Sequence, residues 1–189
     1  MISIIEKTGL LGEVMQKQLS HCEFKQTQRE NKNDIIFVLD NLEYEKNIGS
    51  AFRLADAFNI EKIIIISNKF LDFKKLQKTA RSCESKVSCT ICENEESALK
   101  EIEKLKYTPV CVEITTTSKP LREIDFALLD KVALIVGNEK YGISNFLLEK
   151  VPLSCHIEMY GQNSSMNVAT SLAIVAYKVS EDLLHKNFL

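Results

Sequence analysis

The sequence predicts an α/β fold built on a mainly parallel β-sheet. Short, continuous apolar runs recur along the chain, and they alternate with segments whose apolar residues have helical spacing. Continuous apolar character is typical of parallel strands covered on both faces, and helices supply the crossovers between such strands. With 189 residues, of which 45% are hydrophobic and 26% charged, the chain suits one main globular domain.

The first half of this domain contains three predicted strands. The first is IIFVLD at 35–40, and the helix after it is predicted over 47–58 because its apolar residues share one face. The second strand is the apolar run KIIIIS at 62–67, which precedes a short predicted helix at 72–80. Apolar and polar residues alternate at 87–92, and this alternation predicts the third strand.

The second half continues the alternation. A helix is predicted over 95–106, where apolar residues again line one side. Two more apolar strands follow at 109–114 and 132–136. Ser144 is a suitable N-cap for a short helix that ends at Leu148. The last elements are a brief strand at 155–157 and an apolar helix over about 167–185.

The chain is predicted to divide into an N-terminal helical extension with its linker, residues 1–33, and a main domain, residues 34–189. No apolar run has the length of a bilayer span. The first residues mix acids and bases with apolar residues, which is unlike a signal peptide. We therefore expect a cytoplasmic protein with no membrane partner.

Charge and cysteine patterns leave two questions open. The net charge of −2 does not point to RNA, but residues 69–86 are locally basic. The basic residues in question are Lys74, Lys75, Lys78 and Arg81. They form either a solvated face or a track for phosphates. Cys89 and Cys92 make one C-x-x-C without the second pair that zinc sites use, so we expect free thiols and no metal.

Three segments of small and polar residues adjoin apolar strands, where α/β proteins bind ligands. The first holds Asn47, Gly49 and Arg53 at the start of a helix. Asn47 alone is explained by helix capping, and Arg53 by solvation. The functional interpretation is that Arg53 and the helix N-terminus hold an anionic oxygen or a phosphate.

The second segment, Gly137-Asn-Glu-Lys-Tyr-Gly142, follows the strand at 132–136 directly. It matches neither phosphate-binding glycine fingerprint, a tight turn accounts for its glycines, and Glu139 could cap a backbone amide. The third segment runs from Ile157 through Gly161 and places Ser164, Ser165 and Asn167 before the last helix. One capping residue would suffice there, so the surplus of polar side chains indicates a binding loop.

Taken together in this order, the three segments resemble the motifs of the SpoU/TrmH family of RNA ribose 2'-O-methyltransferases. The resemblance covers roughly residues 34–180. Met166 stands where the family usually has Leu, a volume-conserving change. The family resemblance implies a SPOUT-type α/β fold with a C-terminal trefoil knot, S-adenosylmethionine as cofactor, and a homodimer packed partly through the last helix.

The resemblance also implies roles for individual residues. The cofactor would be held around Thr115, Gly137, Asn138, Ile157, Met159, Ser165 and Met166. The catalytic set would be Arg53, supported by Asn47, Glu139, Ser165 and Asn167. A guanidinium is always protonated, so Arg53 fits oxyanion or phosphate stabilisation better than a base, and the proton acceptor is left open.

The leading functional hypothesis is a 2'-O-methyltransferase that acts on tRNA, because the short N-terminal extension fits a compact tRNA enzyme. The alternatives are an rRNA substrate, a non-catalytic RNA-binding protein of the same fold, and a nucleotide-binding metabolic enzyme. The absence of both phosphate fingerprints counts against the last of these.

Overall fold

The computed structural model describes Gln18, residues 32–69, Ala80 and residues 85–186 of the chain. Every element below belongs to the unit Asn31–Leu189. The predicted extension over residues 1–33 lies almost wholly outside the described residues, so its boundary stays a prediction. The same holds for the predicted helix at 72–80, of which only Ala80 is described.

The core of the unit is a seven-stranded sheet with strand order β3-β2-β1-β6-β4-β7-β5. The strands are β1 (Asn33–Asp40), β2 (Ile60–Ile66), β3 (Ser88–Cys92), β4 (Thr108–Val112), β5 (Lys119–Pro120), β6 (Val132–Val136) and β7 (Ser154–His156). Each neighbouring pair runs parallel. The α/β class with a mainly parallel sheet is therefore confirmed.

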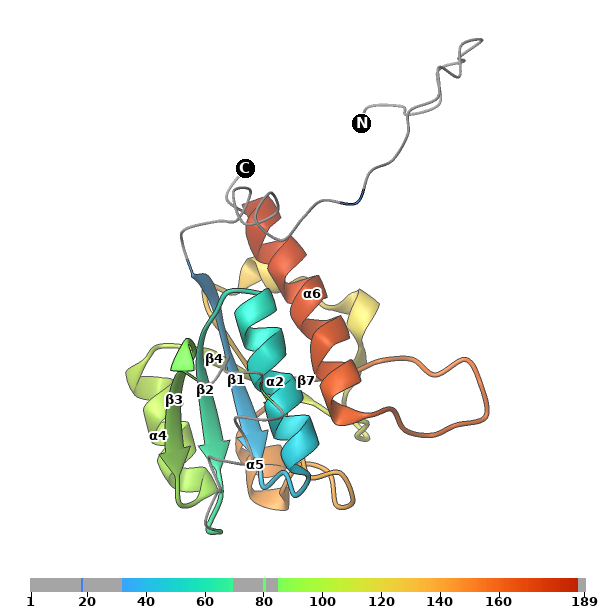
Figure 1. Cartoon of the computed structure of the whole chain (residues 1–189). Helices are drawn as coiled ribbons and strands as arrows, with labels where there is room; N and C mark the ends of the chain where they lie inside the picture. Colours follow the sequence, from blue (N-terminus) through green and yellow to red (C-terminus); the bar gives the residue numbers. More distant parts are fainter. Residues whose placement is uncertain (1–17, 19–31, 70–79, 81–84, 187–189) are drawn as a thin grey trace. The chain divides into compact units, whose positions relative to one another are not determined.

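Helices cover both faces of the sheet. They are α2 (Glu45–Ala57), α4 (Glu95–Lys104), α5 (Asn145–Lys150) and α6 (Val168–Lys186), with short 3-10 turns η2 (Leu121–Glu123) and η3 (Phe126–Leu128). Figure 1 shows α2 and α6 side by side over one face, where Phe52 and Val175 pack with Phe37 of β1. On the other face, Ile102 of α4 packs with Ile36 of β1.

The central strand β1 accounts for the continuous apolar run at 35–40. Its residues alternate between the two faces of the sheet, and both faces are covered, so every residue from Ile36 to Asp40 is buried. Burial of an apolar side chain of this size contributes roughly 1.5–3 kcal/mol. The β3 strand lies at the sheet's edge and has partly exposed residues, which accounts for its alternating pattern.

Two details of the predicted elements differ from the structure. Helix α2 begins at Glu45, so Asn47 lies inside its first turn and is not the N-cap; that position belongs to Tyr44, which makes no side-chain cap bond. Ser144 is the N-cap residue of α5, but its hydroxyl makes no hydrogen bond, and its backbone N–H instead donates to Asp40 at 2.7 Å. The start of α5 is therefore stabilised by a carboxylate distant in sequence, that of Asp40.

Candidate functional site

A cavity of about 410 Å³ lies at the carboxyl ends of β4, β6 and β7. It is lined by residues from all three segments singled out in the sequence, and Val112, Val136 and Ile157 give it apolar walls. In open α/β sheets this is where ligands bind, because the loops that leave neighbouring parallel strands meet there. The three segments therefore converge on one site.

A series of hydrogen bonds joins the three segments. The Asn167 side-chain amide donates to Oδ1 of Asn47 at 3.0 Å. The Asn47 amide in turn donates to Oε1 of Glu139 at 2.8 Å. Asn47, the middle member of the series, is only 8% exposed, whereas Glu139 is partly buried and Asn167 is exposed. These hydrogen bonds thus hold three segments together: the first turn of α2, the turn after β6 and the start of α6.

Glu139 anchors this series through the N-terminus of α2. Its carboxylate accepts the backbone N–H groups of Glu43 at 2.9 Å and Tyr44 at 3.2 Å, as a capping residue would. Burial raises the pKa of Glu139, but hydrogen bonds from Asn47 and from these backbone groups outweigh burial and leave the pKa below its ordinary value. Glu139 is therefore a stable anion that orients Asn47, and it is a poor proton acceptor.

Asn167 combines helix capping with a place in the site. Its Oδ1 accepts the backbone N–H groups of Ala169 and Thr170 at 3.0 and 3.2 Å, which caps α6. Its amide meanwhile bonds Asn47. Ser164 and Ser165 line the same cavity, and no hydrogen bond to either side chain is found within the described residues. Capping therefore accounts for Asn167 alone and leaves both hydroxyls available to a ligand.

The turn after β6 requires its two glycines. A Cβ on Gly137 would lie 2.2 Å from the backbone carbonyl carbon of Gly142, so no side chain fits there. Gly142 has a φ of +70°, in the left-handed region that glycine tolerates best. Asn138 and Gly142 exchange two backbone hydrogen bonds of 3.0 and 2.9 Å that close the turn. The backbone of the turn can consequently approach a ligand closely.

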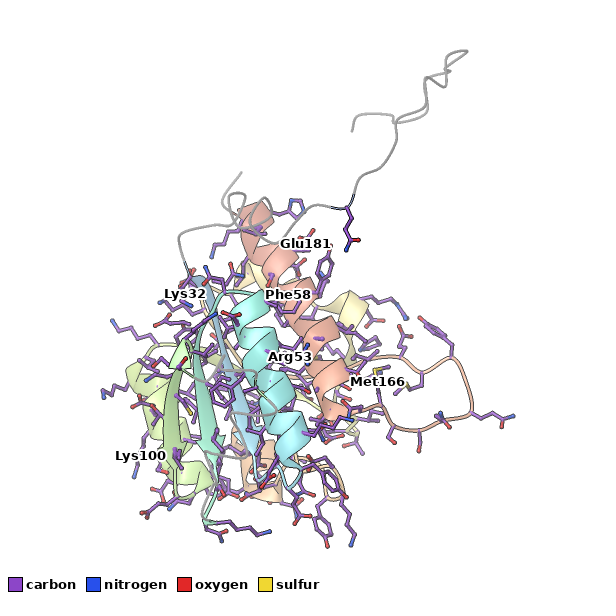
Figure 2. The ribbon with its side chains drawn as sticks, viewed as in Figure 1. Lys32, Arg53, Phe58, Lys100, Met166 and Glu181 are labelled. Carbon is purple, nitrogen blue, oxygen red and sulfur yellow. The ribbon has the colours of Figure 1, made fainter. Side chains whose placement is uncertain are left out.

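Most of the predicted site residues lie in this cavity. The lining includes Asn47, Gly137, Asn138, Glu139, Ile157, Met159, Ser165, Met166 and Asn167. Thr115 is not among the lining residues, and its backbone N–H already donates to the Ser118 hydroxyl at 2.9 Å. Figure 2 shows Met166 where the loop leads into α6. The residue roles that the resemblance implies stay predictions.

Arg53 lies outside this cavity. It lines a separate groove of about 470 Å³ between α2 and α6, together with Ser50 and Thr170. Figure 2 shows Arg53 on α2. Asn167 lines both the groove and the cavity, so the two spaces meet at the Asn47–Asn167 hydrogen bond. Arg53 is exposed, and within the described residues no hydrogen bond or ion pair holds its guanidinium.

Sequence reasoning missed two polar residues of the cavity. Glu113 accepts the backbone N–H groups of Ile114 at 2.9 Å and Ile143 at 3.2 Å. It therefore links the end of β4 to the turn after β6. His156 ends β7 and also lines the cavity, with Nδ1 at 2.9 Å from the Ser118 hydroxyl. For Glu113 the available signal was a polar residue directly after the apolar end of β4.

The structure describes four of the cysteines but only part of the basic run at 69–86. Residues 89, 92, 111 and 155 are free thiols, and no group of metal-ligating side chains forms within the part of the chain that the structure describes. Burial raises the pKa of Cys89 to about 11. The basic residues Lys74, Lys75, Lys78 and Arg81 lie outside the described residues. No described helix is long and apolar enough to cross a bilayer.

The chain is similar to known proteins over most of its length. The model of the SpoU rRNA Methylase family matches residues 34–177. A 23S rRNA (guanosine(2553)-2'-O)-methyltransferase from Bacillus subtilis is 31% identical over 144 residues, 75% of this chain and 56% of that protein. This chain thus spans little more than half of that relative's length. A tRNA (guanosine(18)-2'-O)-methyltransferase from Aquifex aeolicus is 24% identical over 87% of this chain and 76% of that protein.

The fold is also found among solved structures. The SpoU methyltransferase AviRb from Streptomyces viridochromogenes, in complex with the cofactor AdoMet, superposes with a TM-score of 0.71. The match covers 86% of this chain and 64% of that one, at 19% identity. The arrangement of strands and helices in this chain therefore occurs in proteins of that kind.

Proposed function

The chain belongs to the SpoU rRNA Methylase family, and we propose that it transfers a methyl group from S-adenosylmethionine to a ribose 2'-hydroxyl of RNA. The observation that carries this proposal is the hydrogen-bonded series Asn167–Asn47–Glu139, which joins the three motif segments around one cavity. The relatives from Bacillus and Aquifex, both named as 2'-O-methyltransferases, support the same activity.

The cavity fits S-adenosylmethionine in size, polarity and charge. Its volume of about 410 Å³ lies in the range of small-molecule pockets. Apolar walls suit the adenosyl group, and the carboxylates of Glu113 and Glu139 suit a cation. When bound, the cofactor supplies an electrophilic methyl group. The proposed cofactor-binding residues are those implied by the family resemblance: Thr115, Gly137, Asn138, Ile157, Met159, Ser165 and Met166.

The proposed catalytic work is alignment and charge stabilisation. Asn47, Glu139 and Asn167 keep the cavity wall rigid, which favours a fixed attack geometry. The hydroxyl of Ser165 orients the ribose. Arg53 stabilises the developing 2'-oxyanion or the neighbouring phosphate from the adjoining groove. The low pKa of Glu139 argues against this carboxylate as the proton acceptor.

We propose tRNA as the substrate, a homodimer packed partly through α6, a C-terminal trefoil knot and a cytoplasmic location. Of the two sequence relatives, the tRNA enzyme is matched over the larger share of its length, 76% against 56%. Ile174 and Tyr177 of α6 are exposed in the single chain, which favours a partner on that helix. Sedimentation of the purified protein as a monomer would contradict the dimer.

The activity is tested by methyl incorporation from labelled S-adenosylmethionine into bulk tRNA and rRNA from a strain that lacks this gene. Nuclease mapping should find the label in an alkali-resistant dinucleotide from tRNA. Label found only in rRNA would show that rRNA, and not tRNA, is the substrate. No label, with a protein that still binds RNA, would favour a non-catalytic RNA-binding protein.

The role of Arg53 has its own test. We expect Arg53→Ala to abolish methyl transfer while cofactor affinity changes little, because Arg53 lies outside the cofactor cavity. Binding is measured by calorimetry with S-adenosylhomocysteine. Equal loss of transfer and binding would contradict the proposed role.

The basic run at residues 74–81 is proposed to contact RNA phosphates. Neutralising Lys74, Lys75 and Lys78 should weaken RNA binding and flatten its salt dependence, by about 0.7–0.9 in slope for each phosphate that is no longer neutralised. An unchanged slope would make these residues a solvated face.

A further inference from the structure

A second cavity, of about 390 Å³, lies beside the cofactor cavity at the same edge of the sheet. Its walls come from the ends of β1 and β2, represented by Asp40 and Ser67, and from the start of α5. The strand order places β1 next to β6, whose end lines the first cavity. Asn138 and Gly142 line both spaces, so the turn after β6 separates them.

The floor of the second cavity is rigid because its polar side chains bond one another. Asp40 accepts the N–H of Ser144 at 2.7 Å and the amide of Asn41 at 2.9 Å. Asn138 donates its amide to the carbonyl of Asn41 at 2.7 Å. These groups are committed to the fold. They hold the shape of the cavity and leave recognition to the residues around its mouth.

Tyr141 supplies an aromatic plane at this mouth. It is 73% exposed and lines the second cavity. The backbone below it is fixed, because the side-chain carbonyl of Asn138 accepts the N–H groups of Lys140 at 2.9 Å and Tyr141 at 3.1 Å. The Lys140 ammonium lies 5.1 Å from the ring centroid. An exposed ring on a held backbone, next to a cation, is an arrangement on which unpaired nucleobases stack.

Three polar side chains complete the mouth. Lys69 and Glu43 form an ion pair of 3.3 Å with side chains 74% and 45% exposed, so the pair is weak and easily exchanged. Released from each other, the ammonium suits a phosphate and the carboxylate suits a base amino group. The amide of Asn145 makes no hydrogen bond within the described residues and can donate or accept.

We propose that this second cavity binds an unpaired nucleotide of the RNA, adjacent to the nucleotide that receives the methyl group, with its base stacked on Tyr141. The inference rests on the proposed function, since the first cavity is taken to hold the cofactor and the reacting ribose. Its consequence is that the substrate presents at least two consecutive unpaired nucleotides. A duplex would leave Tyr141 without a base to stack on.

Fluorescence anisotropy with labelled RNA tests this inference. The probes are a single-stranded RNA of about 12 nucleotides, a length within the usual span of single-strand sites, and the same strand in a duplex, with S-adenosylhomocysteine present. The protein variants are Tyr141→Ala, Tyr141→Phe and Asn145→Ala. Leu128→Ala is the matched control, because Leu128 is 81% exposed and lines neither cavity.

Tyr141→Ala loses the stacking of one base, so it should bind the single-stranded RNA about 5-fold to 140-fold more weakly than the native chain does. Tyr141→Phe and Leu128→Ala should stay within about twofold of the native chain, because the first keeps the ring and the second leaves both cavities untouched. Asn145→Ala should bind more weakly than the control, since it removes a polar group from the mouth. S-adenosylhomocysteine affinity should be unchanged in all variants, which also shows that they fold.

A fluorescent base reports on stacking directly. A 2-aminopurine in the strand should lose fluorescence on binding the native chain but not on binding Tyr141→Ala. The same quenching with both proteins would contradict stacking on Tyr141.

Two further outcomes contradict different claims. Native-like RNA affinity of Tyr141→Ala, or equal affinity of the native chain for strand and duplex, overturns the second nucleotide site and leaves the proposed function intact. A native chain that binds neither the RNA probes nor S-adenosylhomocysteine would instead contradict the proposed function itself.

Discussion

Removal of the Asn47 side chain should destabilise the protein in a pH-dependent manner. Asn47→Ala deletes the donor to Oε1 of Glu139, at 2.8 Å, and the acceptor for the Asn167 amide, at 3.0 Å. A hydrogen bond to a charged group contributes about 1.5–3 kcal/mol and a neutral one about 0.5–1.5 kcal/mol. We expect the free energy of unfolding to fall by about 2–4 kcal/mol at neutral pH.

The pH dependence follows from the lowered pKa of Glu139 in the folded state. Its charge contributes stability above the ordinary glutamate pKa of about 4.3, and that contribution is lost as the pH falls through the folded-state value. Without Asn47 the folded-state pKa moves up, so the contribution shrinks. The difference between native chain and Asn47→Ala should therefore be largest near neutral pH and narrow below about pH 4.3.

The assay is urea unfolding followed by circular dichroism between about pH 3 and pH 7, a range that extends below the ordinary glutamate pKa of about 4.3. Asn94→Ala is the matched control, because this N-cap of α4 accepts the N–H of Ser97 at 2.9 Å and has no charged partner in that bond. The free energy of unfolding that Asn94→Ala loses, about 0.5–2 kcal/mol, should be the same at each pH. A pH-independent loss for Asn47→Ala, or one below that of Asn94→Ala, would refute the assigned Glu139–Asn47 interaction.

Two further predictions concern the turn after β6 and the buried thiols. Gly137→Ala places a Cβ 2.2 Å from the Gly142 backbone, so we expect a loss of at least about 2 kcal/mol in urea unfolding. Gly161→Ala meets nothing within 4 Å and should change stability by under about 0.5 kcal/mol; equal losses would contradict the packing argument. Burial raises the pKa of Cys111 and Cys155 to about 12, so neither should react with Ellman's reagent at mildly alkaline pH until urea unfolds the chain. Rapid labelling of either native thiol, located by peptide mass spectrometry, would count against that burial.

The sheet was predictable from sequence because its central strands are buried on both faces. An unbroken apolar run such as 35–40, flanked by helical segments, is the expected pattern of a covered parallel strand. The β5 strand was not predictable, since two residues carry no periodicity. Its pairing with β7 depends on long-range geometry alone.

The start of α2 could not be read from its own residues. Asn47 has the chemistry of an N-cap, yet the helix begins earlier, at Glu45, and the carboxylate of Glu139, 95 residues away from Tyr44, accepts the backbone N–H groups of the two residues before it. A capping carboxylate so distant leaves no local signal. The cavity residues in the motif segments were predictable as a group, whereas Glu113 and the second cavity arise from segments that only the fold brings together.

The contact between Asn47 and Asn167 spans 120 residues of sequence. Such a bond forms late in folding, because parallel strands must pair before its two ends can meet. A chain with an unfinished sheet therefore lacks the cavity wall and has no competent site. Ligand binding should consequently be selective for the completed fold and raise the melting temperature with ligand concentration.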